Sequence, residues 1–240
     1  MSWSEGLGGH DSRALGIDRR APTERIALGE GGTCWVDLTR AFVREPAEVL
    51  AELSGSVTWQ QGETWRYDRW VEERRLGASV RHEAMPGALR QARAHLDARY
   101  RVRFGGAAVI LYRDGNDFQG LHTDREMRWL DDTLIAIAVL GERRPFVLRP
   151  RRDWTDPEAR RDASEDVVLL PGHGDLLVMG GRSQREWLHG VPAAAVEGPR
   201  VSIIWRWTSR RGAPDTAPGY NEGRHFSDRR GPGGRRTRPV

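Results

Sequence analysis

The sequence contains no lysine: all 38 of its basic residues are arginine. A chain without lysine cannot form a Schiff base with a carbonyl substrate, use a lysine general base, or bind phosphates through a P-loop lysine. Cys34 is the only cysteine, so a disulfide framework and a metal site built on thiolates are also excluded. These two absences remove several large classes of enzyme and metalloprotein from consideration.

Long apolar runs are missing as well. No stretch approaches the ~20 apolar residues of a membrane-spanning helix, and the N-terminal MSWSEGLGGHDSR lacks the apolar core of a signal peptide. We therefore expect a soluble, cytoplasmic protein. A length of 240 residues suits one substantial domain, while 38% hydrophobic against 30% charged residues indicates that part of the chain is not packed.

The two ends account for the unpacked part. Residues 1–30 are Gly-rich and charged without a clear period, which predicts a flexible N-terminal arm. Residues 209–240 hold eight Arg and three acidic residues, a net charge of +5 in a chain that carries +4 overall. This composition predicts a basic disordered tail that contacts phosphate backbones or only aids solubility. A single domain is expected over 31–208.

The expected elements of this domain are two helices followed by many strands. The helices are predicted at 45–53 and 86–99, and residues 59–80 are expected to be a hairpin or a loop that covers a substrate. Short β-rich runs, separated by Gly, Pro and Asp, lie at 33–38, 107–112, 133–140, 144–150, 166–171, 175–180 and 200–207. Strands without intervening helices favour an antiparallel sandwich or barrel, with the two helices packed outside it.

A candidate metal site starts at LHTD, residues 121–124. Residues two apart on an extended strand point the same way, so His122 and Asp124 can reach one ion. The third ligand could be His173 in PGHGD or His189 in WLHGVP. Two His and one carboxylate leave three positions open, as in non-haem Fe(II) oxygenases, whereas zinc favours a tetrahedral site. The simpler alternative is a polar strand end without a metal.

A second pattern lies in RVSIIWRW at 200–207. Alternation places Arg200, Ser202, Ile204 and Arg206 on one face of the expected strand. The guanidinium group is a planar fork that matches carboxylates, so two of them on one face indicate a site for an acidic cosubstrate. The alternative is the solvent-exposed side of an edge strand.

Together these segments resemble the AlkB family of Fe(II)/2-oxoglutarate-dependent dioxygenases. Their order and separations also match over about 107–207, the catalytic core. The matching segments are YRDG at 112–115, HTD at 122–124, HGDLLVMGG at 173–181, WLHGV at 187–191 and RVSIIWR at 200–206.

The resemblance implies a mainly β fold, a double-stranded β-helix or jelly roll, with N-terminal helices packed outside. It also implies an enzyme that uses Fe(II), 2-oxoglutarate and O2. The metal ligands would be His122, Asp124 and His189.

Four residues match positions that bind 2-oxoglutarate in the family. Arg200 is expected at the distal carboxylate of 2-oxoglutarate, and Arg206 near the carboxylate beside the keto group. Tyr112 and Ser202 are expected to contact the same cosubstrate. The family usually has Asn where this chain has Ile110 and Ser202. Serine can still donate a hydrogen bond and isoleucine cannot, so weaker cosubstrate binding or a rearranged pocket is expected.

Glu126 matches an acidic residue that contacts the target base in the family, although it could instead pair with Arg125 or Arg128. A carboxylate suits a positively charged N-methylated base such as 1-methyladenine or 3-methylcytosine. The implied reaction is oxidative demethylation of such bases in DNA or RNA, with release of formaldehyde. The substrate would be single-stranded or have its base flipped out.

The stacking and phosphate-binding residues of the substrate site are predicted from residue type alone. Trp65 and Tyr67 are the expected stacking aromatics, whereas Trp59 and Trp70 could be core residues. Candidate phosphate contacts are the tail and Arg143, Arg144, Arg149, Arg151 and Arg152. The sequence also allows two alternatives: a 2-oxoglutarate oxygenase acting on protein or a small molecule, and a non-catalytic nucleic-acid-binding jelly-roll module.

Overall fold

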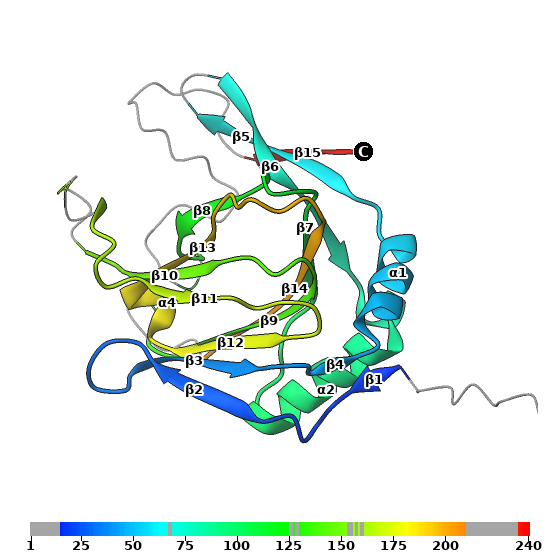
Figure 1. Ribbon diagram of the computed structural model, residues 1–240, viewed down its shortest axis with the longest axis horizontal. Helices are drawn as coiled ribbons and strands as arrows, with labels where there is room; N and C mark the ends of the chain where they lie inside the picture. Colours follow the sequence, from blue (N-terminus) through cyan, green and yellow to red (C-terminus); the bar gives the residue numbers. More distant parts are fainter. Residues whose placement is uncertain are drawn as a thin grey trace, which may run out of the picture.

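A computed structural model gives the arrangement of the chain (Figure 1). It describes residues 15–66, 69–124, 127, 130–152, 156, 158, 161–209 and 235–240.

Two antiparallel sheets form the body of the molecule. The larger has nine strands in the order β15 (Arg235–Pro239), β5 (Gln60–Arg66), β6 (Arg69–Val80), β7 (Ala107–Tyr112), β14 (Arg200–Thr208), β9 (Thr133–Gly141), β12 (Leu176–Gly181), β3 (Cys34–Thr39) and β2 (Thr23–Ala27). The smaller has four, in the order β11 (Val167–Leu169), β10 (Phe146–Pro150), β13 (Trp187–Val191) and β8 (Gln119–His122). Facing sheets with this antiparallel pairing confirm the predicted jelly roll.

The remaining elements are short strands and helices. β1 (Gly16–Ile17) pairs with β4 (Val43–Arg44) apart from the two sheets. The helices are α1 (Pro46–Ser56), η1 (His82–Ala84), α2 (Gly87–Tyr100) and α4 (Ser183–Glu186). Both predicted helices are therefore present, and α1 and α2 lie outside the larger sheet (Figure 1). None of the helices in the described residues has the length and apolarity needed to cross a membrane.

β9 shows why the run at 133–141 is so apolar: both of its faces are buried. Its even-numbered side chains pack with the helices, in a cluster that includes Leu134, Ala136, Ala138, Leu140, Val49, Leu53, Leu89 and Leu96. Its odd-numbered side chains pack between the sheets, with Ile135, Ile137, Val139, Phe146, Leu148 and Trp187. A central strand covered on both faces loses the apolar–polar alternation of a half-exposed strand.

The ends of the chain differ in part from the prediction. Residues 1–30 were expected to be a loose arm, yet they contain β1 and β2. The tail was expected to be disordered from 209 onward, yet β15 pairs with β5 over five residue pairs. In both places backbone hydrogen bonds to a neighbouring strand order the segment, and amino-acid composition alone does not predict such pairing. The segment 59–80 forms the predicted hairpin, β5–β6.

Candidate metal centre and cosubstrate pocket

Two histidines come together because their strands are neighbours in the smaller sheet. His122 closes β8, His189 lies in the middle of β13, and the two residues are directly paired in the antiparallel register. Cross-strand partners project side chains from the same face of a sheet. The ring centroids are accordingly 4.3 Å apart, and the His189 ring also stacks on Phe146 at 5.9 Å.

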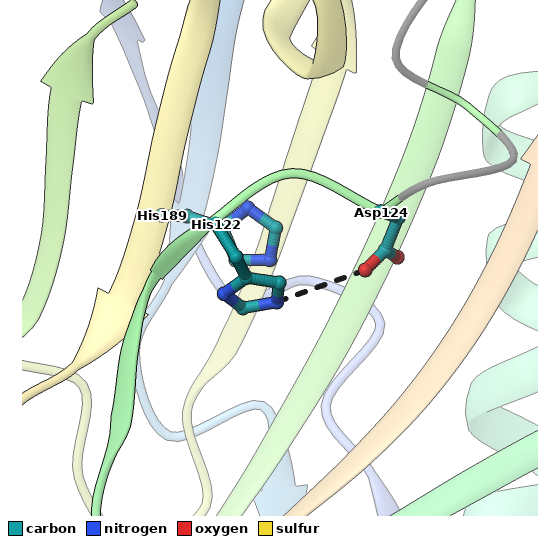
Figure 2. A group of neighbouring side chains, drawn as sticks. All are labelled: His122, Asp124 and His189. Carbon is teal, nitrogen blue, oxygen red and sulfur yellow. Dashed lines mark ion pairs between the residues drawn. The ribbon is translucent and has the colours of Figure 1, made fainter. Parts of the chain in front are cut away.

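Asp124 completes the cluster from just beyond the end of β8. The three residues His122, Asp124 and His189 each offer a ligand atom within 4.8 Å of the others. Figure 2 shows both imidazoles and the carboxylate directed toward one region, with His122 Nε2 3.8 Å from Asp124 Oδ1. The buried Gln184 side chain fixes the loop, because its Oε1 accepts a hydrogen bond of 2.9 Å from the Asp124 backbone N–H.

The tautomer of His122 follows from its contacts. Nδ1 lies 2.9 Å from the Gly120 carbonyl oxygen, which can only accept, so Nδ1 carries the proton. Nε2 then carries the lone pair, which accepts from Gln119 Nε2 at 2.7 Å. A carbonyl that holds the far nitrogen of a histidine is a common way to orient a metal ligand.

Desolvation disfavours the charged form of both imidazoles, and the neutral form is the one that binds a metal. Desolvation lowers the pKa of His122, although the Asp124 carboxylate opposes the shift. Desolvation and the neighbouring His122 lower the pKa of His189 to about 3. For Asp124 burial alone would raise the pKa, but the charge of Arg206 and further interactions outweigh it and the pKa is lowered.

These contacts fit a divalent metal by the chemistry of the donors. Two neutral imidazoles and an ionised carboxylate form the set used by non-haem Fe(II) enzymes. His189 Nδ1 is buried and has no hydrogen-bond partner among the described residues, which is costly in a closed core. Of the two candidates for the third ligand, His189 is in the cluster. His173 is elsewhere, where its Nδ1 accepts from the Gly141 N–H at 2.8 Å.

Arg200 and Tyr112 are also directly paired, on β14 and β7 of the larger sheet. Arg200 is fully buried, so the alternative of an exposed edge strand is wrong for this residue. Desolvation lowers the pKa of Arg200 to about 10. Its Nη1 donates to the Pro171 carbonyl oxygen at 3.1 Å, and its Nη2 has no partner among the described residues. A buried guanidinium with a spare donor fits a carboxylate ligand.

Arg206 lies six residues further along the same face and is half-buried. Its Nε donates to Asp124 Oδ2 at 2.6 Å, which joins β14 to the histidine cluster. The opposite face of β14 packs Val201, Ile203 and Trp205 into the core with the helices. The predicted alternation of this strand is therefore confirmed.

A cavity of about 840 Å³ connects these groups. A volume of this size is within the ~300–1,000 Å³ of small-molecule sites. Its walls come from β6, β7, β14 and the smaller sheet, and they include Tyr112, His122, Asp124, His189, Ser202 and Arg206. Arg200 lies behind this wall, next to Ser202, whose hydroxyl is 3.5 Å from Arg200 Nε.

The two departures from the family pattern lie in the same wall. Ile110 and Ser202 are paired across β7 and β14, and both line the cavity. Ser202 keeps a polar contact with Arg200, whereas Ile110 presents only hydrocarbon. One polar position of the usual pocket is thus replaced by an apolar one.

Several residues of the site have no obvious signal in the sequence. Arg75 on β6 lines the cavity, pairs with Glu73 Oε2 at 3.0 Å, and contributes to the lowered pKa of His122. Gln119 contacts both His122 and the Tyr112 hydroxyl, the latter at 3.4 Å. Their roles depend on which strands become neighbours, so only the length of β6 and its Arg-rich composition could have suggested Arg75.

Other expected substrate residues fall in different places. Glu126 and Tyr67 lie outside the described residues. Trp65 packs edge-to-face against Trp70 at 5.5 Å and is not part of the cavity wall, and Trp59 packs against the core. Arg144 was a candidate phosphate contact and that prediction is wrong, because its side chain is fully buried on three backbone carbonyls.

Comparison with known proteins agrees with this geometry. The model of the 2OG-Fe(II) oxygenase superfamily matches residues 35–218, so the chain belongs to that superfamily. Its curated relatives are alkB homologues, which makes it an AlkB-family dioxygenase, an oxidoreductase that uses Fe(II), 2-oxoglutarate and O2.

Two relatives illustrate the extent of the similarity. The alpha-ketoglutarate-dependent dioxygenase alkB homolog 3 of Homo sapiens is 29% identical over 227 residues, covering 82% of this chain and 78% of the relative. The DNA oxidative demethylase ALKBH2 of Arabidopsis thaliana is 33% identical over 129 residues, covering 46% of this chain and only 41% of the relative. A solved 2OG-Fe(II) oxygenase family oxidoreductase from Burkholderia pseudomallei has a TM-score of 0.47 at 14% identity, covering 74% of this chain and 87% of that one.

Proposed function

We propose that this protein oxidatively removes N-alkyl groups from bases of the 1-methyladenine and 3-methylcytosine type in DNA or RNA, with release of formaldehyde. The observation that carries the proposal is the cluster of His122, Asp124 and His189 at the wall of a cavity of about 840 Å³. The similarity to a DNA oxidative demethylase and to an alkB homologue supports the substrate class.

In this proposal His122, Asp124 and His189 hold Fe(II). Iron bound there would, with 2-oxoglutarate and O2, supply the oxidation of the N-alkyl carbon, for which the products would be succinate, carbon dioxide and formaldehyde. The protein's own contribution is positioning. Gly120 and Gln184 orient the ligands through the hydrogen bonds described above.

The cosubstrate is assigned to the wall between β7 and β14. Arg200 and Arg206 would bind its two carboxylates, and Tyr112 and Ser202 would add hydrogen bonds. Buried Arg200 with a spare Nη2 donor supports this assignment, because an unpaired buried cation is costly. Ile110 cannot contribute, so we expect weaker 2-oxoglutarate binding than with an amide at this position.

Glu126 is proposed to contact the alkylated base. A carboxylate neutralises the positive charge of an N-methylated adenine or cytosine and accepts from its exocyclic nitrogen. The base has to reach the cavity from a single strand or by flipping, because a stacked base is inaccessible.

The test measures succinate and formaldehyde from the full chain with Fe(II) and 2-oxoglutarate, with and without an oligonucleotide that contains 1-methyladenine. The proposal predicts turnover that depends on the methylated base, and one formaldehyde for each base restored. Glu126→Gln should lose most of the oligonucleotide-dependent turnover with little change in the KM for 2-oxoglutarate. Turnover indifferent to methylated bases would favour a protein or small-molecule substrate, and no turnover at all would favour a binding module.

The basic tail is proposed to contact the phosphate backbone. Deleting 209–240 would also remove β15 from the larger sheet, so neutralising charge is the cleaner change. Replacing Arg210, Arg211, Arg224, Arg229 and Arg230 by Gln should weaken oligonucleotide binding and flatten its dependence on salt, because fewer counterions are released. Unchanged affinity and salt slope would mean that these residues do not contact phosphates.

A further inference from the structure

Phe118 combines features that the metal centre does not explain. The residue is 44% exposed and also lines the cavity, which places it at the cavity mouth. The large hydrophobic side chains that are exposed in the described residues are Leu15, Phe118, Val168, Leu170 and Val240, and Phe118 is the aromatic among them. The other Phe and Tyr of the cavity wall, Tyr112 and Phe146, are buried at its base.

The loop that carries Phe118 is held firmly. It joins β7 of the larger sheet to β8 of the smaller one (Figure 1). The Phe118 N–H donates to the Arg74 carbonyl oxygen on β6 at 2.8 Å. The carbonyl of the preceding Asp117 accepts from buried Arg144 Nη2 at 2.6 Å, and the Asp117 carboxylate binds Arg113 in a two-point pair.

An exposed phenyl ring on a fixed loop can stack against a planar ligand. A ring that is already ordered loses little conformational entropy when it binds, so its contact area is available at low cost. Nothing in the described core needs this ring, since it belongs to neither hydrophobic cluster.

The charges beside Phe118 indicate the kind of partner. Arg74 is exposed, lines the cavity, and forms no ion pair within the described part of the chain. The adjacent acidic residues are already matched, Glu72 with Arg238 and Glu73 with Arg75. Phe118 and Arg74 are joined by a backbone hydrogen bond and line the same cavity. An exposed aromatic ring and a guanidinium without an ion pair, on neighbouring segments of one wall, suit a base and its phosphate, the combination found where proteins bind single-stranded nucleic acid.

We propose that Phe118 stacks on the base adjacent to the one in the cavity, and that Arg74 contacts the phosphate of that nucleotide. This inference rests on the proposed function and deepens it. The enzyme would then need at least one neighbouring base in a single strand, in addition to the alkylated base itself.

The test compares wild type with Phe118→Ala and Phe118→Trp on a single-stranded oligonucleotide that contains one 1-methyladenine. Phe118→Ala removes the stacking contact and should lower kcat/KM about tenfold. Phe118→Trp keeps an aromatic ring and should leave kcat/KM near the wild-type value. The KM for 2-oxoglutarate stays unchanged in both. Val168→Ala is the matched control, because this exposed apolar residue lies on β11 outside the cavity wall.

A second substrate isolates the contact. When the nucleotides on both sides of the methylated one are abasic, phosphates remain but bases do not. On this substrate the kcat/KM of the wild type should fall to that of Phe118→Ala, and the kcat/KM of Phe118→Ala should fall no further. An undiminished difference on the abasic substrate, or full activity of Phe118→Ala on the normal one, would overturn the proposal.

Measuring the affinity for an oligonucleotide distinguishes a failure of this inference from a failure of the proposed function. Fluorescence anisotropy with an unmodified single-stranded oligonucleotide should show the same loss for Phe118→Ala, and Arg74→Gln should reduce the salt slope by about one. If wild type does not demethylate but these differences in affinity appear, the function fails and the stacking contact stands. If demethylation occurs without them, the stacking contact is rejected alone.

Discussion

Arg206 Nε donates to Asp124 Oδ2 at 2.6 Å, so the proposed metal cluster and the proposed cosubstrate pocket share one ion pair. Arg206 projects from β14 of the larger sheet, whereas Asp124 follows β8 of the smaller one. The pair therefore fixes the two sheets relative to each other at the site. Any change to Arg206 should affect both metal and 2-oxoglutarate.

Arg206→Gln should weaken Mn(II) binding, used as a redox-stable substitute for Fe(II), by about 10–100-fold, as is typical when a partner of a ligand is lost. The same variant should raise the KM for 2-oxoglutarate. Calorimetry for the metal and steady-state kinetics for the cosubstrate measure the two effects. Arg149→Gln removes the Arg149–Asp166 pair at 2.7 Å, which lies outside the cavity wall, and should leave both values unchanged.

Without metal, the protein should lose stability as pH falls below about 6.5, the ordinary pKa of histidine. The pKa of His189 is lowered to about 3 in the folded state. Between these values the unfolded chain binds a proton that the folded chain excludes, so stability is complete above the window and decreases toward its lower end. Urea unfolding at pH 7.5 and pH 5.0 measures the slope.

His189→Gln is the comparison for this pH effect. The variant lacks the titrating ring, so its unfolding free energy should change less between pH 7.5 and pH 5.0. Equal slopes for the two proteins would show that His189 is not kept neutral by burial.

The sequence predicted the site better than it predicted the edges of the sheets. Arg200 and Arg206 could be placed because alternation along a strand fixes which side chains share a face. Asp124 was predicted on the same strand as His122, yet it lies in the loop just after β8 and reaches the cluster from there. The choice of His189 over His173 needed the resemblance, because spacing alone does not say which strand pairs with β8.

The missed features depend on long-range pairing. β15 pairs with β5 although about 170 residues separate them in the sequence. Its order comes from backbone hydrogen bonds, which many different sequences could make. Arg144 was predicted on the surface because arginine is rarely buried. Its burial follows from three carbonyls that converge only after β7, β8 and β13 are in place.

Arg144→Met should destabilise the protein strongly. The Arg144 guanidinium donates to the carbonyl oxygens of Asp114, Asp117 and Pro192 at 2.9, 2.6 and 2.8 Å. Each acceptor left without a donor costs roughly 1–3 kcal/mol. A total of about 3 kcal/mol or more would lower Tm by ~6–12 °C. Arg143→Met removes one exposed hydrogen bond to Leu170 and should shift Tm far less; equal shifts would contradict the burial argument.

Cys34 should resist alkylation in the folded protein. Its side chain is fully buried, and burial together with a hydrogen bond to Glu186 Oε2 at 3.2 Å raises the thiol pKa to about 11. The thiolate is the reactive form, and only ~0.1% of Cys34 is in that form at pH 8. Burial also blocks the access of a reagent to the sulfur. Iodoacetamide labelling followed by mass spectrometry should show no adduct until urea unfolds the chain. Rapid labelling at pH 8 without denaturant would show that this edge of the sheet opens.

Metal binding should stabilise the fold, and the effect should disappear when a ligand is removed. A ligand at 100 times its Kd stabilises the folded state by about 2.7 kcal/mol, which corresponds to a rise in Tm of ~5–11 °C for a chain of this size. We therefore expect Mn(II) to raise Tm by this amount in wild type, and EDTA to reverse it. Asp124→Asn keeps the size of the side chain but loses its charge, and should show little shift. His173→Gln changes a histidine outside the cluster and should respond as wild type does. An equal response of wild type and Asp124→Asn would place the metal elsewhere, and the assignment of His122, Asp124 and His189 as ligands would be wrong.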